Sequence, residues 1–65
     1  MSEFTDALKL KYKADIAMIQ ANLKNYLDNS VGVADHPDIV KDIDDLVSSL
    51  STAQEKLKTI EDLKL

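Results

Sequence analysis

The side chains with the clearest capacity for chemistry gather around His36, the single imidazole of this 65-residue chain. Carboxylates stand close to it in sequence at Asp35, Asp38 and Asp42. Imidazole and carboxylate are both ligands for divalent metals. A second histidine is absent from the sequence, however, and a lone histidine beside a helix start is typical of an exposed loop. We therefore predict no metal site.

Hydroxyl groups are the other candidates, and four of them lie close together at Ser48, Ser49, Ser51 and Thr52. A hydroxyl nucleophile needs a neighbouring base and an oxyanion donor in a concave pocket, and no histidine is near these residues. The chain has one glycine, so it cannot form a glycine-rich phosphate loop. We expect no catalytic residues, no cofactor and no enzymatic activity.

The charge of the chain argues against several classes of partner. Its net charge is -4, and all eight basic residues are lysines. A nucleic-acid-binding protein normally presents a basic patch with arginines, so direct nucleic-acid binding is not expected. The N-terminal residues do not resemble a signal peptide, and no run approaches the roughly 18 apolar residues of a membrane span. A cytoplasmic protein without membrane contact is predicted.

Residues 38–65 show one uninterrupted helical pattern. Its apolar positions alternate between spacings of four and three residues, which is the seam of a left-handed coiled coil. They are Ile39, Ile43, Leu46, Leu50, Ala53, Leu57 and Ile60. We predict a helix over about residues 36–64.

A second helix is predicted over about residues 3–28. Its apolar stripe consists of Phe4, Leu8, Tyr12, Ile16, Ile19, Leu23 and Tyr26. When the two stripes are paired in reverse order, the residue numbers of every pair add up to between 64 and 66. A constant sum is what two antiparallel helices require. We predict an all-α fold, a two-helix hairpin that forms a single domain over 1–65.

The first helix carries a further strip of small and apolar residues away from this seam. The strip contains Ala7, Leu10, Ala14, Ala17, Met18 and Ala21, and Leu27, Val40 and Val47 widen the apolar surface. Because a two-helix hairpin has no closed core, we predict a homodimer or higher oligomer, a four-helix bundle with this strip at the interface. Alanine is also a good helix former at exposed positions, which is a second explanation of the strip.

The turn is expected over about residues 29–35, with Gly32 freeing its backbone angles. Asp35 can cap the second helix, whose start is expected at Asp35 or His36, and Pro37 suits the first helical turn because its missing N–H has no partner there. The acidic start of this helix and the histidine form a candidate partner surface. It consists of His36, Asp38, Asp42 and Asp45.

Around this turn the chain resembles short proteins encoded by large tailed phages, especially marine cyanobacterial myoviruses. In those proteins an Asn-x-Pro-Val-Gly segment precedes a Glu-His-Pro-Asp corner between two helices. The matching residues are Asn29, Val31, Gly32, His36, Pro37, Asp38 and Ile39, whereas Ser30, Ala34 and Asp35 depart from the usual Pro, Gly and Glu. The resemblance implies a phage-infected bacterial cytoplasm and a role in binding, and it supplies no catalytic residue.

Together these observations predict a small non-enzymatic interaction protein that associates with itself and binds a host or phage protein. One alternative is an acidic inhibitor that mimics nucleic acid and occupies a nucleic-acid-binding enzyme. Its charge would come from Asp35, Asp38, Asp42, Asp44 and Asp45. Another alternative is a minor structural component of a virion.

Overall fold

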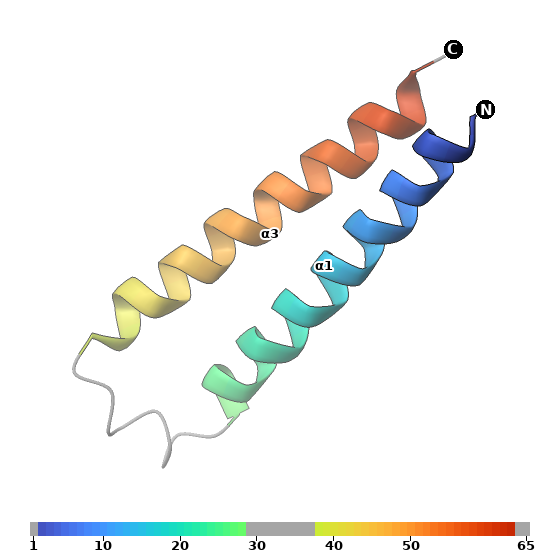
Figure 1. The fold of residues 1–65 in the computed structure, drawn as a ribbon. Helices are drawn as coiled ribbons and strands as arrows, with labels where there is room; N and C mark the ends of the chain where they lie inside the picture. Colours follow the sequence, from blue (N-terminus) through green and yellow to red (C-terminus); the bar gives the residue numbers. More distant parts are fainter. Residues whose placement is uncertain (1, 29–37, 64–65) are drawn as a thin grey trace.

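The computed structural model describes residues 2–28 and 38–63, and it shows two α-helices, α1 (Glu3–Asp28) and α3 (Ile39–Asp62). The helices run antiparallel along each other, so that the two chain ends lie at the same end of the molecule (Figure 1). No strand occurs in the described part of the chain. The expected all-α hairpin is therefore confirmed.

Helix α1 begins where a serine can satisfy its first amides. The backbone N–H of Thr5 donates to the Ser2 hydroxyl over 3.2 Å, and the Thr5 hydroxyl donates back to the Ser2 carbonyl oxygen over 2.9 Å. A helix start leaves such amides without intrahelical partners, so a side-chain oxygen at this position stabilises it. The helix then continues without a glycine or proline to Asp28.

Helix α3 begins later than the sequence pattern indicates. Asp38 is its N-cap, with non-helical angles (φ -138°, ψ 64°), and its carboxylate accepts the N–H of Lys41 over 3.3 Å. The expected helix start at residue 36 is therefore wrong, because Asp38 and not Asp35 caps α3. Asp35, Pro37 and the expected turn over 29–35 lie outside the described residues.

The two helices touch along their apolar stripes. Only Ala53 and Ile60 are buried among the described residues, at 6% and 9% exposure. The other stripe residues that are partly buried are Tyr12, Ile16, Ile19, Leu23, Tyr26, Ile39, Ile43, Leu46, Leu50 and Leu57. The seam is therefore a line of half-covered side chains, as expected for two helices with open flanks on both sides.

The N-terminal end of the α1 stripe departs from the expected pairing. Phe4 is 84% exposed and Leu8 is 37% exposed, although Ile60 opposite them is buried. Phe4, Leu8 and Tyr12 follow one another at four-residue steps, and each step turns the stripe by about 40°. Over two steps Phe4 is carried about 80° away from Tyr12, which places it outside the contact with α3.

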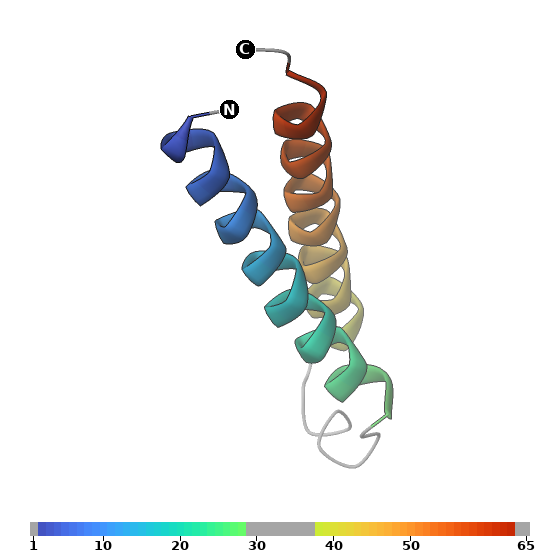
Figure 2. The ribbon, with the colours of Figure 1, turned by 90° about the vertical axis from the view of Figure 1, so that its right-hand side faces the viewer.

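The hairpin is long and narrow, with extents of 47 × 15 × 13 Å. Figure 2 shows that the two helix axes are inclined to one another. Neither helix in the described part has a stretch long and apolar enough to cross a bilayer.

Candidate interaction surfaces

The six residues predicted to form an interface all lie on α1, and all are exposed. We call them the far face: Ala7, Leu10, Ala14, Ala17, Met18 and Ala21. At about 100° per residue, this face is centred on the side of α1 opposite the residues that contact α3. The large members are the most informative, because Leu10 is 69% exposed and Met18 is 61% exposed. The far face is an apolar strip, and no other element of the described residues covers it.

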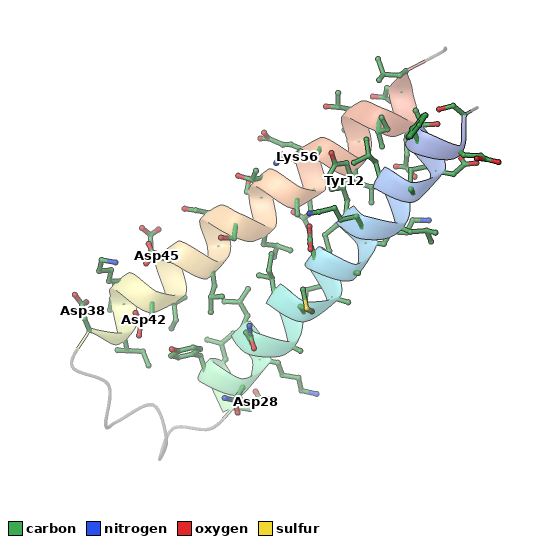
Figure 3. The ribbon with its side chains drawn as sticks, in the orientation of Figure 1. Tyr12, Asp28, Asp38, Asp42, Asp45 and Lys56 are labelled. Atoms are coloured by element: carbon green, nitrogen blue, oxygen red, sulfur yellow. The ribbon has the colours of Figure 1, made fainter. Side chains whose placement is uncertain are left out.

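Met18 differs from the other residues of the far face because it lies at the edge of that face. It borders an open groove between the helices, together with Ile19 and Ala53. The remaining lining is polar and consists of Asp15, Ser48, Ser49, Thr52 and Lys56. Figure 3 shows Lys56 of α3 at this groove, with Tyr12 of α1 close by.

This groove contains three of the four candidate hydroxyl nucleophiles, those of Ser48, Ser49 and Thr52, but no residue of its lining activates them. No imidazole is among the groove residues, and the one carboxylate, Asp15, pairs with Lys11 over 2.9 Å. That hydrogen bond, with the charge of Asp15, raises the pKa of Lys11 above its ordinary value of 10.5. Asp15 therefore contacts Lys11, and in the described residues no hydrogen bond joins it to a hydroxyl of the groove.

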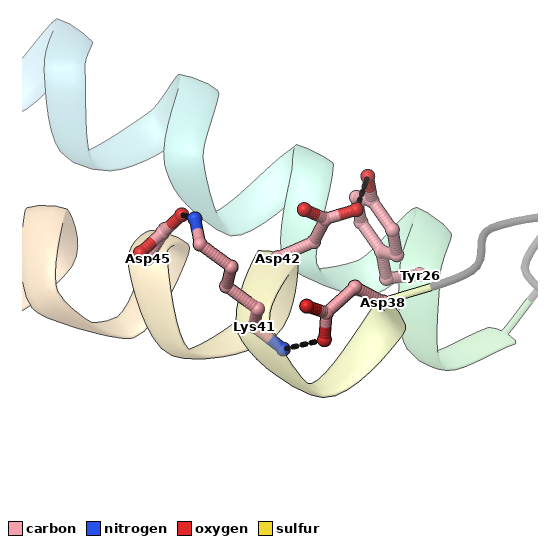
Figure 4. Close-up of polar contacts among 5 residues, drawn as sticks. All are labelled: Tyr26, Asp38, Lys41, Asp42 and Asp45. Atoms are coloured by element: carbon pink, nitrogen blue, oxygen red, sulfur yellow. Dashed lines mark hydrogen bonds and ion pairs between the residues drawn. The ribbon is translucent and has the colours of Figure 1, made fainter.

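The acidic start of α3 is occupied by internal contacts (Figure 4). The Lys41 ammonium pairs with Asp45 over 2.9 Å, and the Tyr26 hydroxyl of α1 donates to Asp42 over 3.3 Å. Asp38 is the cap described above. The hydrogen bond to Asp45, followed by the charge of that carboxylate, raises the pKa of Lys41 above 10.5.

The structure therefore brings three of the four residues of the candidate partner surface to one end of α3. Asp38, Asp42 and Asp45 are there, whereas His36 lies outside the described residues. Each of the three carboxylates has a partner within the hairpin. All three carboxylates thus make contacts within the hairpin, although Asp38 and Asp45 remain exposed.

A second apolar patch lies across both helices and consists of Leu27, Val40 and Val47, which are 68%, 76% and 49% exposed. Val40 and Val47 are seven residues apart and share one flank of α3. The groove residues Ser49 and Lys56 are on the other flank of that helix. The same geometry places Leu27 on the flank of α1 away from the groove, so the patch faces the side opposite the groove.

In the described residues, no three His, Cys, Asp or Glu side chains converge as a metal site would require. Comparisons of the chain with protein-family models, curated proteins and solved structures find no match. The surfaces themselves are therefore the observations from which a function can be inferred.

Proposed function

We propose that this protein is a non-enzymatic helical hairpin that binds a second copy of itself through the far face of α1 and acts as a small interaction protein. The observation that carries the proposal is the imbalance between buried and exposed apolar side chains. Two residues of the described chain are buried, whereas eight large apolar side chains are exposed. The exposed set is Phe4, Leu8, Leu10, Met18, Leu27, Val40, Val47 and Leu63.

A chain of this length is marginal as an isolated unit, because small domains bury too little apolar surface to offset the loss of chain entropy. Disulfides are one remedy, but the sequence has no cysteine. Association is another, since a second copy removes apolar side chains from water on both chains at once. The far face suits this role because it is continuous along α1 and uninterrupted by α3.

The resemblance to phage proteins supports a cellular context for the proposal. It rests on the segment around Gly32, His36 and Pro37, which lies outside the described residues. A host or phage protein in an infected bacterial cytoplasm is the partner that this context suggests. The second apolar patch is available for such a partner when the far face is occupied by another copy of the chain.

Sedimentation equilibrium combined with circular dichroism tests the proposal. We expect the apparent mass to rise from that of the 7.2 kDa chain toward twice that value over micromolar to high micromolar concentrations, with helicity maintained throughout. A fully helical monomer at the highest concentration would contradict self-association. Added salt provides a further distinction, because an apolar interface responds weakly to ionic strength and an acidic contact surface responds strongly.

A further inference from the structure

Resting on the proposed self-association, we infer that the second copy packs antiparallel on the far face of α1, with the two Ala14 residues meeting at a two-fold axis. Because α3 lies on the opposite side of α1, the four helices of this dimer form a row with the two α1 helices in the middle. This arrangement differs from a square bundle, in which each helix has neighbours on adjacent sides.

The size pattern of the far face fits this register. With Ala14 at the axis, residues whose numbers add up to 28 lie at the same level, so Ala7 meets Ala21 of the second copy. Leu10 meets Met18 of the second copy in the same register. Three alanines at seven-residue intervals let the helix axes approach closely, and the Leu10 and Met18 side chains fill the space between them.

Charge complementarity selects the antiparallel orientation. Asp6 and Lys24 are eighteen residues apart, which corresponds to five helical turns, so they share one flank of the far face. A two-fold axis perpendicular to the helices brings this flank against the same flank of the second copy. Asp6 then lies within about 3 Å, measured along the helix axis, of the level of Lys24 from the other copy. The axis repeats this pair, which gives two contacts between opposite charges.

Parallel packing would not form these pairs, because a two-fold axis along the helices places Asp6 and Lys24 of one copy on the opposite flank of the interface from Asp6 and Lys24 of the other copy. Opposite charges that meet in only one orientation are one means by which flanking positions specify orientation in coiled coils. Within the described part of the hairpin neither Asp6 nor Lys24 forms an ion pair, whereas Lys11, Lys41 and Lys58 each pair with an aspartate. Both side chains are therefore available for contacts with another chain.

Disulfide trapping tests the orientation directly, since the natural chain has no cysteine. We would prepare Ala7→Cys and Ala21→Cys, confirm by sedimentation that both still associate under reducing conditions, and oxidise each alone and as an equal mixture. In the antiparallel dimer Cys side chains at 7 and 21 meet, whereas two copies of position 7 are about 21 Å apart, beyond disulfide reach. Ser51→Cys on α3 is the control and should not cross-link with Ala21→Cys.

The expected result is a covalent dimer that contains one chain of each kind, formed from the mixture and in much lower yield from either variant alone. Efficient cross-linking of Ala7→Cys with itself would overturn the inference in favour of parallel packing. If sedimentation shows a dimer but no far-face pair cross-links, the inference is wrong while self-association stands. If the natural chain is monomeric, the proposed function fails as well.

Discussion

The phenol of Tyr26 on α1 donates a hydrogen bond over 3.3 Å to a carboxylate oxygen of Asp42 on α3. The stripe pattern pairs Tyr26 with Ile39, but the long phenol reaches a residue almost one turn further along α3. Its ring contributes to the half-buried seam while its hydroxyl stays at the polar edge, beside Asn22 and Asp45. This contact links the two helices close to the end at which the chain reverses.

The first prediction concerns the titration of Tyr26. Desolvation, then the charge of Asp42 and the hydrogen bond to it, raise the pKa of this phenol above its ordinary value of 10.0. A raised pKa in the folded state means that the unfolded chain loses the proton first. The stabilising contribution is therefore complete below about pH 10 and is lost as the pH rises through the folded-state pKa.

NMR of chains labelled with ¹³C at the tyrosine ring measures this pKa, with Tyr26→Phe assigning the signal. In Asp42→Asn the Tyr26 pKa should fall toward 10 but remain above it, because desolvation persists when the charge is removed. An unchanged Tyr26 pKa in Asp42→Asn would show that the carboxylate has no influence on the phenol.

The second prediction concerns Ile60, one of the two buried residues. Truncation to alanine removes apolar contacts with α1 and should lower the free energy of unfolding by about 2 kcal/mol, the low end for such changes because the seam is open to water. Urea unfolding followed by circular dichroism measures this effect. Leu63→Ala, at a neighbouring residue that is 39% exposed, is the control and should cost much less. Equal losses in the two variants would contradict the observed burial of Ile60.

Much of the fold follows from spacing alone. The alternation of four and three residues from Ile39 to Ile60 predicts one continuous face, and the constant residue-number sums predict the antiparallel pairing that the structure shows. The residue-number sums do not predict the exposure of Phe4, because they give the level of a residue along the helix but not its angle around the helix axis. The angle of Phe4 follows instead from the four-residue steps near the N-terminus, each of which rotates the stripe by about 40°.

The start of α3 and the contacts of the candidate partner surface could not be predicted from the sequence for a different reason. Two aspartates precede the apolar stripe, and the sequence favours Asp35 as the cap because a proline follows at a first-turn position. The structure has Asp38 there instead, since its carboxylate reaches the amide of Lys41 three residues later. The far face is exposed, which agrees with its expected location outside the seam. The contacts of Asp42 and Asp45 within the hairpin could not be predicted from residue spacing, because they depend on how far the side chains extend.

The third prediction tests this cap. Asp38→Ala removes the acceptor for the Lys41 amide and should lower the free energy of unfolding by about 1 kcal/mol. Asp44→Ala removes the same charge from an exposed position in the first turns of α3 and is the matched control. Thermal unfolding of both variants separates the cap from general charge effects, and equal stabilities would argue against a capping role for Asp38.

The fourth prediction tests the ion pairs inferred between two copies. Asp6→Lys or Lys24→Asp alone should weaken association by about fivefold to tenfold, since each dimer then has two repulsive pairs in place of two attractive ones. The double variant should restore the affinity. The effect of the single changes should shrink in high salt because these charges are exposed.

Circular dichroism provides the control for this series, because Asp6 also lies in the first turn of α1, where a negative charge favours the helix. A loss of helicity in Asp6→Lys would be corrected for by comparing variants at equal helix content. If single and double variants associate alike, the two side chains do not face each other across the interface.

The central claim is that the far face of α1 holds a second copy of the chain, and Ala14→Glu tests it most directly. This change places two carboxylates at the two-fold axis, where both would lose water, and should raise the dimer dissociation constant by about 100-fold. Gln20→Glu adds the same charge at an exposed position outside the far face and is the matched control. In sedimentation equilibrium at one concentration, the account predicts a helical monomer for Ala14→Glu and a dimer for Gln20→Glu; a dimer of unchanged affinity for Ala14→Glu would contradict it.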